Sequence, residues 1–516
     1  MVLRSLIAAL AIGLGGSVIG LAQSSSSSPA PERSHAERFS TIEMRAERVE
    51  TDANKRLVAK SDDADALNLR GVARLLMGRY KEAQDDLRRA VALNPDNAAY
   101  QANFASALWK LGRAEEAIAA EYAAIKLDDK NFNAHYQLGR FLLLVGGRER
   151  LDETIQHLRR AIEIDPRHYE VRFELISAYR ALGDIAHAAS QLDFLWDARP
   201  SDPRVFYANA LLAADRNDLN SAIRDFSETL RRDPSLFNAW QDLGVAYMKL
   251  KRWPEAVQTF AEFARRRPDS VEAAYFSALS LFNAGRVEDA EREVRRALRI
   301  DAGATEAHTL LGVILASRGS ANAEANETLL QAVALNPNSF DAEFYLGRVL
   351  YAMKDYAGAV KSMRAAVSLD PRHAEARFFL GTALEAAGES GAAMTEYQEL
   401  AKSDPQSAMG QLGLGALLVK QGKTEEAVTA LRSAVALDPK NFEGHLALGR
   451  ALMLLQRFSE AVESLTNAVS LAPNRSDAHY QLGLALRRVG RIQEANREFA
   501  IVDRLNTEFR TNQVQK

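Results

Sequence analysis

The side chains best suited to chemistry in this chain are its histidines, and their spacing keeps them apart. The chain of 516 residues holds nine histidines and no cysteine. Four histidines share one position of a repeated pattern: His135, His308, His445 and His479. No two histidines have the H-E-x-x-H spacing or another spacing that lets one helix present two metal ligands. We therefore predict structural histidines, with no metal site and no catalytic histidine.

Two glycine-containing motifs resemble nucleotide-binding loops, but neither has the surrounding sequence that such a loop requires. In Gly422-Lys423-Thr424 the preceding glycine, Gly415, lies two residues too far away for a phosphate-binding loop. No strand leads into this motif or into the Gly-Leu-Gly at 413–415. The chain also lacks a G-x-S-x-G motif and has no cysteine nucleophile. We predict that the protein is not an enzyme and needs no cofactor.

The overall composition is that of a soluble, folded protein. Hydrophobic residues make up 47% and charged residues 26% of the chain, and the net charge is −3. This balance provides no general attraction to phosphate backbones or anionic lipid. We predict no nucleic-acid partner.

The N-terminus has the pattern of a secretory signal peptide. Arg4 precedes an apolar stretch from Leu6 to Leu21, and a Ser- and Pro-rich segment follows. We predict a signal peptide over 1–22 and a linker over 23–35, and hence an exported protein, periplasmic or secreted if bacterial. The alternative is an uncleaved membrane anchor, for which 16 residues are short. No later segment is apolar enough for stable membrane insertion of the mature chain.

A period of 34 residues organises the rest of the chain. Two series of prolines follow it: Pro166, Pro200, Pro234 and Pro268, then Pro337, Pro371, Pro405, Pro439 and Pro473. With the first repeat taken as 64–97, repeat position 8 is glycine in nine of thirteen repeats, and position 20 is alanine in twelve. Because glycine inside a helix costs about 1 kcal/mol relative to alanine, we expect two helices to cross closely between positions 8 and 20.

Each repeat contains two stretches of helical periodicity. In 477–505, apolar residues keep helical spacing on both sides of Gly490, which ends the first helix. Asn, Asp or Ser residues near the proline are suited to capping the next helix. No stretch alternates with period two, so we expect no strands.

The repeat pattern resembles the tetratricopeptide repeat family. In 237–270 the matching residues are Trp240, Leu243, Gly244, Tyr247, Ala256, Phe260 and Pro268. The resemblance covers 64–509. It implies an all-α fold, a right-handed α-solenoid of about 13 helix pairs. It also implies protein–protein binding as the activity.

The resulting domain plan places an N-terminal capping helix at 36–63 and a short tail at 510–516. The predicted repeats are 64–97, 98–131, 132–168, 169–202, 203–236, 237–270, 271–304, 305–339, 340–373, 374–407, 408–441, 442–475 and 476–509. Insertions at 146–154 and 319–325 fall in turns and are expected to interrupt the regular array.

The resemblance implies a non-catalytic scaffold or adaptor that binds a protein or peptide partner in its concave groove, and the signal-peptide pattern predicts that this scaffold is exported. The resemblance further suggests a place in cell-envelope machinery. The alternative function is a regulatory subunit of a separately encoded envelope enzyme. The sequence does not identify the partner.

Repeats 9 and 10 provide the candidate binding residues. Repeat positions 2, 5, 9 and 12 share one face of the first helix because they are three or four residues apart. They are Asp341, Phe344, Arg348 and Tyr351 in repeat 9, and Glu375, Phe378, Thr382 and Glu385 in repeat 10. Aromatic rings beside carboxylates suit an extended or helical segment with apolar anchors and basic side chains. The alternative is that this face is ordinary helix surface.

Overall fold

The computed structural model describes residues 35–319 and 322–514. The predicted signal peptide and nearly all of the predicted linker lie outside these residues. The described residues form helices joined by turns and contain no strand. The all-α solenoid class predicted from the sequence is therefore confirmed. None of the described helices is both long and apolar enough to span a membrane.

The chain forms two compact units that divide within α14 (Trp253–Arg266), between Thr259 and Phe260. The first unit contains α2 (His35–Ala59), α3 (Ala64–Leu76), α4 (Tyr80–Leu93), α5 (Ala98–Lys110), α6 (Ala114–Leu127), α7 (Phe132–Val145), the 3₁₀ helix η2 (Arg148–Arg150), α8 (Leu151–Ile164), α9 (Tyr169–Leu182), α10 (Ile185–Ala198), α11 (Pro203–Asp215), α12 (Leu219–Arg232) and α13 (Phe237–Lys249).

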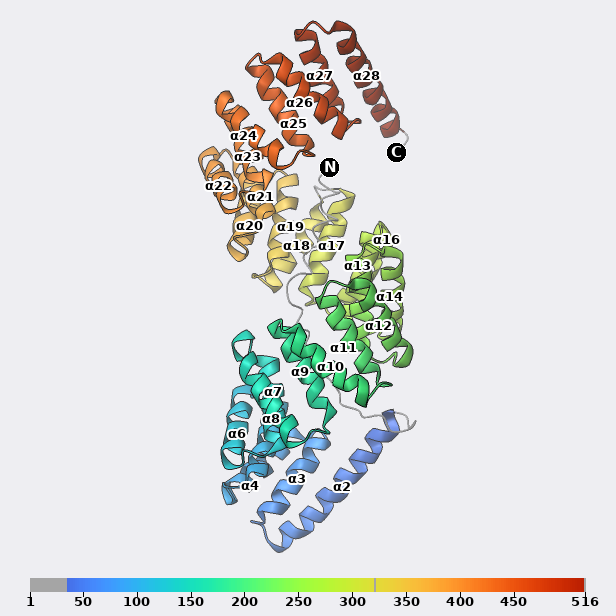
Figure 1. Cartoon of the computed structure of the whole chain (residues 1–516), viewed down its shortest axis with the longest axis vertical. Coiled ribbons are helices and arrows are strands. Elements are labelled where there is room, and N and C mark those ends of the chain that lie inside the picture. The colour runs from blue at the N-terminus through green and yellow to red at the C-terminus, as the bar shows by residue number, and fades with distance from the viewer. Residues whose placement is uncertain (1–34, 320–321, 515–516) are drawn as a thin grey trace. The chain divides into compact units, whose positions relative to one another are not determined.

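The second unit continues the alternation of helices from the end of α14 (Figure 1). It contains α15 (Val271–Asn283), α16 (Val287–Ile300), α17 (Thr305–Arg318), α18 (Ala323–Leu335), α19 (Phe340–Ala352), α20 (Tyr356–Leu369), α21 (Ala374–Ala386), α22 (Ser390–Ser403), α23 (Ala408–Lys420), α24 (Thr424–Leu437), α25 (Phe442–Leu454), α26 (Phe458–Leu471), α27 (Ser476–Arg488) and α28 (Ile492–Val514).

Local sequence signals set the ends of these helices. Polar residues accept hydrogen bonds from the first turn of the helix that follows, as Asn131 does from the Ala134 amide and Asn441 from the Gly444 amide. The turn between the two helices of a pair uses left-handed backbone. Gly490 has φ 81° there, and Lys354 takes φ 64° at the same repeat position.

The glycine at repeat position 8 packs most closely against position 24 of the same helix pair, whereas we expected position 20 there. Position 20 also lies at this crossing: a Cβ added to Gly415 would be 3.3 Å from the carbonyl oxygen of Ala427. A Cβ added to Gly381 would lie 2.5 Å from Cε1 of Tyr397, and one added to Gly71 would lie 2.5 Å from Cγ of Leu87. The alanine at position 20, such as Ala393, is buried nearby. Positions 20 and 24 lie one helical turn apart on the same face. The large side chain one turn further along therefore fills the space that glycine leaves.

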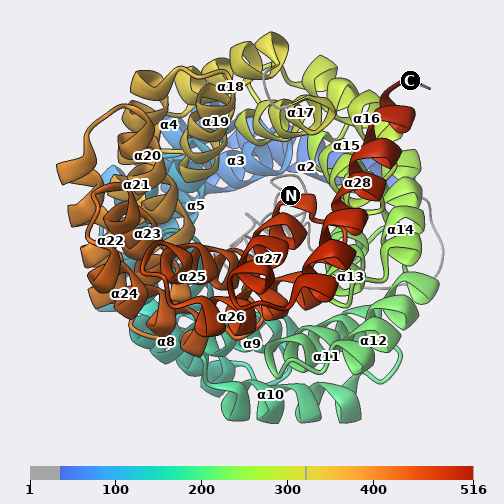
Figure 2. The same ribbon diagram turned by 90° about the horizontal axis from the view of Figure 1, so that it is seen from above.

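First helices of successive pairs also contact one another within each unit. In the second unit α17 contacts α19 and α21 contacts α23; in the first unit α3 contacts α5 and α9 contacts α11. Figure 2 shows α19, α23 and α25 on the inner side of the second unit, with α20, α22 and α24 outside. Four of the predicted binding residues lie on α19 of this row, and the other four lie on α21, which contacts both α19 and α23.

The helix before the first repeat is held by a charged network. α2 packs against α3. The Glu50 carboxylate accepts hydrogen bonds from Arg74 at 2.8 Å and from Arg79 at 2.7 Å. Asp86 also accepts from Arg74, at 2.7 Å. Since Glu50 and Arg74 are largely shielded from solvent, this network joins α2 to the first helix pair.

Candidate partner-binding site

The eight predicted binding residues lie on two neighbouring inner helices. Four are on α19 and four on α21, and these helices contact each other directly. The first helices of repeats 9 and 10 therefore bring the two sets together, as the periodicity predicted.

Four of the eight side chains remain available to a partner. Asp341 is exposed, and Tyr351, Glu375 and Phe378 are half-buried. They combine two carboxylates with two aromatic rings. Aromatic side chains supply apolar contact area at low entropic cost, and a half-buried carboxylate strengthens its attraction for a cation. The accessible part of the site is thus acidic and aromatic.

Phe344 is not an accessible platform, and this part of the prediction is wrong. It is only 2% exposed and packs against Phe340 and His373 of its own repeat. The Phe379 ring of the next repeat contacts it edge to face. Helical spacing on α19 places Phe344 on the inner face. It does not show that residues from the neighbouring repeat surround the ring.

Arg348 is likewise buried, at 7% exposure, so it is not the accessible cation that we predicted. Its guanidinium carbon lies 4.8 Å from the centre of the Phe379 ring. The nearest oxygen of Glu375 is 3.6 Å from the guanidinium. Burial lowers the pKa of Arg348, because desolvation disfavours the charged form. Arg348 therefore connects α19 to α21.

Thr382 and Glu385 are held by partners within the protein. The Tyr397 hydroxyl, from the second helix of repeat 10, donates to Glu385 at 2.7 Å and lies 3.3 Å from the Thr382 hydroxyl. Lys420 on α23 donates to the other Glu385 oxygen at 2.6 Å. Burial raises the pKa of Tyr397, so this hydroxyl remains a donor. These two residues position neighbouring helices.

Lys420 and Tyr397 were missed by the sequence reasoning, although a signal for Lys420 existed. Lys420 follows Glu385 by 35 residues, one period plus one. The same offset joins Arg180 to Asp215 and Tyr207 to Asp242. A search for complementary polar residues 34 or 35 positions apart would have found these inter-repeat contacts.

The histidines at repeat position 4 tie the turns between repeats. In each, Nε2 lies about one hydrogen-bond length from the carbonyl oxygen six residues earlier: 3.1 Å for His135, 3.0 Å for His308, 3.1 Å for His445 and 3.0 Å for His479. Trp240 donates from its indole nitrogen to Pro234 in the same way. Since a carbonyl only accepts, Nε2 carries the proton. The shared histidine position is therefore structural.

No three-residue metal site lies within the described part of the chain. No group of three or more His, Cys, Asp or Glu side chains there could hold a metal ion. The closest approach of two histidines is between the Nδ1 atoms of His135 and His157, 3.0 Å apart. That distance is one of a hydrogen bond between rings.

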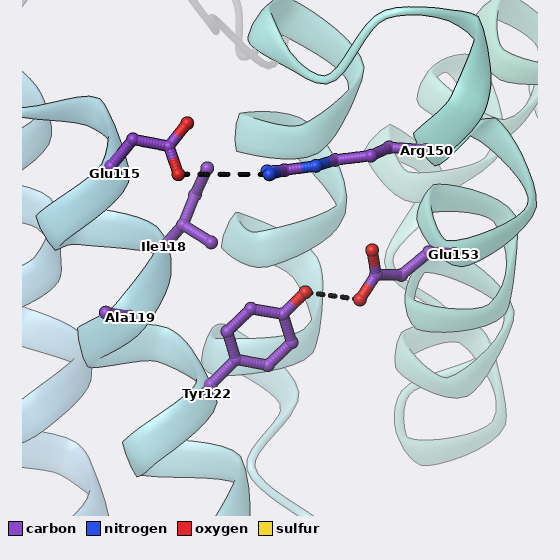
Figure 3. Close-up of a pocket in the computed structure, with 6 residues that line it drawn as sticks. All are labelled: Glu115, Ile118, Ala119, Tyr122, Arg150 and Glu153. Carbon is purple, nitrogen blue, oxygen red and sulfur yellow. Dashed lines mark hydrogen bonds and ion pairs between the residues drawn. The ribbon is translucent and has the colours of Figure 1, made fainter.

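A small pocket lies between α6 and α8, with a volume of about 280 Å³ (Figure 3). Figure 3 shows the Tyr122 hydroxyl directed at Glu153, to which it donates a hydrogen bond. Arg150 faces Glu115 across the opening at 3.9 Å. Burial, with a contribution from Glu153, raises the pKa of Tyr122 to about 12. Because its polar groups pair with one another, this pocket has no arrangement suited to acid–base chemistry.

Comparison with known proteins identifies the repeats. Models described as tetratricopeptide repeat match residues 64–97, 147–214, 207–271, 242–305, 275–340, 310–371, 344–408 and 446–500. A model described as TPR repeat matches 415–456. Together these matches cover well over half of the chain.

The curated relatives and solved structures that match the chain share little sequence identity with it. The chain is similar to Tetratricopeptide repeat protein 37 of Xenopus laevis, at 22% identity over 40% of this chain and 14% of that protein. It is also similar to the human Protein O-mannosyl-transferase TMTC3, at 22% identity over 56% of this chain and 31% of that protein. The chain spans less than half the length of these relatives.

Among solved structures, yeast Tom70 matches at 15% identity and a TM-score of 0.41, over 81% of this chain and 99% of that one. The repeat pattern, the paired helices and the family matches agree along the array. The chain belongs to the tetratricopeptide repeat family.

Proposed function

We propose that this protein is a non-catalytic scaffold that binds a protein or peptide partner on the inner side of α19 and α21. The observation that carries the proposal is the set of accessible acidic and aromatic side chains on these neighbouring helices, Asp341, Tyr351, Glu375 and Phe378. The other four predicted residues are buried or paired inside the protein. They hold the accessible set in place.

The chemistry of the accessible set favours a segment with apolar and basic side chains. Phe378 supplies a ring that stays partly open to solvent. Glu375, which also faces Arg348, lies one helical turn before it, and Asp341 adds an exposed carboxylate on α19. The Phe378 ring rests against Phe379 and Tyr397, with centroids at 6.1 Å and 5.8 Å. A ring held in this way is pre-organised, which lowers the cost of ordering the site on binding.

The test is direct binding of defined peptides to the full chain. Fluorescent peptides that pair Leu or Phe with Lys or Arg should bind, and versions with Glu in place of the basic residues should not. Because rim charges and a central aromatic anchor each affect affinity, Phe378→Ala with Asp341→Asn and Glu375→Gln should weaken binding at least tenfold.

The matched control is Tyr480→Ala on α27, an aromatic residue at repeat position 5 that is 47% exposed. It should leave binding unchanged. Equal loss in both variants, or equal affinity for the acidic peptides, would refute this site. Phe344 is not substituted in the test, because removing this buried ring would destabilise the fold and so confuse the binding result.

We also propose that the protein is exported, as a periplasmic or secreted scaffold in cell-envelope machinery. The support is the sequence pattern of residues 1–22, which lie outside the described structure. Expression of the full chain followed by fractionation and N-terminal sequencing tests this proposal. Cleavage after about residue 22 is expected. An intact N-terminus in the soluble cell interior would rule out export.

A further inference from the structure

Glu121 occupies the centre of a helix pair where every other repeat has an apolar or aromatic residue. It lies on α6 at repeat position 24 and is 0% exposed. In the other twelve repeats this position holds Leu87, Leu158, Leu192, Phe226, Phe260, Val294, Leu329, Met363, Tyr397, Leu431, Leu465 and Phe499. This is the core position that packs against the glycine of position 8, where repeat 2 has Ala105.

Neither carboxylate oxygen of Glu121 has a hydrogen-bond partner among the described residues. The buried residues of α5, α6 and α7 form an apolar cluster that includes Leu108, Ile118 and Leu138. A carboxylate without a partner in such surroundings is costly, because ionisation there loses hydration and gains nothing in return. Buried carboxyl groups of this kind hold a proton in the folded state.

No charged neighbour changes this conclusion. The titratable residues of the elements packed around α6 include Tyr100 and Lys110 on α5, His135, Tyr136 and Arg140 on α7, Arg150 at the end of η2, and Glu153 and His157 on the adjoining part of α8. Glu115, Glu116, Tyr122 and Lys126 lie on α6 itself. Burial alone raises the pKa of Glu121 well above its ordinary value.

The location makes local opening possible. Helix α7 ends at Val145 and is followed by Gly146, Gly147 and the short helix η2, where the three-residue insertion breaks the repeat. In a repeat array each helix pair depends mainly on its nearest neighbours. Segments of such arrays open without unfolding the whole chain.

We propose that α5, α6 and α7 form a proton-dependent joint, which is closed while the Glu121 carboxyl is neutral and opens when it ionises. The folded-state pKa is raised, so the stability of this segment is complete below the unfolded value, near 4.3. That stability declines as the pH rises from there to the raised value. Each pH unit in this window increases the opening equilibrium about tenfold, because opening releases one proton.

Hydrogen exchange of the full chain between pH 5 and pH 9, corrected for the intrinsic rate, measures this opening. In the wild type the opening constant of residues 98–145 should rise about tenfold per pH unit over part of this range. In Glu121→Gln, which cannot ionise at this position, the rise with pH should vanish. Only an opposite dependence below about pH 6.5 should remain, because burial lowers the pKa of His135 and His157 and opening lets them take up protons. Glu121→Leu restores the residue type of the other repeats and should also raise the protection of this segment.

The matched control is Glu116→Gln on the same helix, where the carboxylate is exposed and pairs with Arg113. It should keep the wild-type slope. A wild-type segment whose opening is independent of pH would overturn the proposal. A rise with pH that persists in Glu121→Gln would overturn it as well, since the proton would then belong to another group. Glu121→Gln decides the question even if Glu121→Leu folds poorly.

Discussion

Two pairs of neighbouring inner helices, α9 with α11 and α15 with α17, are joined by different forces. Between α9 and α11, Arg180 pairs with Asp215 at 2.5 Å and Arg204 pairs with Glu170 at 2.7 Å. These four side chains are between 23% and 29% exposed. The first unit therefore connects these two helices with half-buried ion pairs.

Between α15 and α17 neither of these ion pairs can form. The residues at the repeat positions of Arg180 and Asp215 are the uncharged Phe282 and Ser317, and those at the positions of Glu170 and Arg204 are two carboxylates, Glu272 and Glu306. The buried residues of α15 include Leu279 and Phe282, and those of α17 include Val313 and Ala316. Apolar burial is insensitive to salt, whereas ion pairs near the surface are screened. The comparison shows that one repeat geometry is compatible with both kinds of contact. The family pattern alone does not specify which side chains line the inner face.

The largest expected effect is overpacking at the glycine of α17. A Cβ at Gly312 would lie 2.5 Å from Cγ of Leu329. Gly312→Leu should therefore lower the free energy of unfolding of the second unit by about 1–3 kcal/mol. The same repeat position is Ile176 in α9 and Ala210 in α11. Of these three helices, α17 is therefore the one in which a glycine lets the second helix of the pair pack closely.

Urea denaturation with hydrogen exchange over residues 305–335 measures this change locally. Gly391→Leu is the control, because no heavy atom lies within 4 Å of a Cβ added there. If both variants are equally stable, position 8 is not the close contact of the helix pair. Gly381→Leu, against Tyr397, repeats the test in the candidate binding region.

The second effect concerns the N-terminal caps of α11 and α15. Asp202 caps α11 by accepting from the Arg204 amide at 3.0 Å, and its side chain also pairs with the Arg204 guanidinium. Burial disfavours the charged form of Asp202 and by itself would raise its pKa. The hydrogen bonds from Arg204 have the larger combined effect, so the pKa of Asp202 is lowered. Ser270 caps α15 by accepting from the Ala273 amide at 3.1 Å and does not titrate in this range.

Removal of either cap should cost about 1–2 kcal/mol near pH 7. For Asp202→Ala the cost should disappear in acid, because a lowered folded-state pKa gives stability that is lost as the pH falls from about 4 through that pKa. For Ser270→Ala the cost should persist. Chemical denaturation at pH 7 and pH 2.5 compares them, and equal pH dependence would contradict the proposed difference.

A smaller effect is expected from the ion pair between Arg180 and Asp215, which joins α9 to α11. A double-mutant cycle with Arg180→Met and Asp215→Asn should give a coupling of about 0.5–1 kcal/mol, as for other partly exposed ion pairs. The same cycle on Arg231 and Glu228, which lie on one helix, should give less. Additive effects in the Arg180 cycle would mean that the pair does not join α9 to α11.

The smallest effect is that of salt. Raising NaCl from 0.1 M to 1 M shortens the Debye length from about 10 Å to about 3 Å. Hydrogen exchange of α9 and α11 should quicken by less than about fivefold, which corresponds to 1 kcal/mol or less, and that of α15 and α17 should stay the same. Equal sensitivity of the two pairs would show that the ion pairs contribute little.

Much of the fold could be predicted from local residues, and much of the site could not. The helix pairs, their glycine turns and their polar caps follow from spacing within one repeat. The contact of position 8 with position 24 was missed because two positions one turn apart satisfy the same periodicity. The burial of Phe344 was missed because Phe379, in the next repeat, supplies part of its surroundings.

The sequence by itself determined that this protein is an all-helical array of tetratricopeptide repeats. Helix hydrogen bonds, caps and turns depend on residues within a few positions, and the 34-residue period repeats them along the chain. Only the tertiary structure decided which inner side chains a partner can reach. Exposure depends on what adjoining repeats place beside each side chain, and a one-helix pattern does not contain that information. The difference is clearest on α21, where Glu385 is paired with Tyr397 and Lys420 while Phe378 stays partly open.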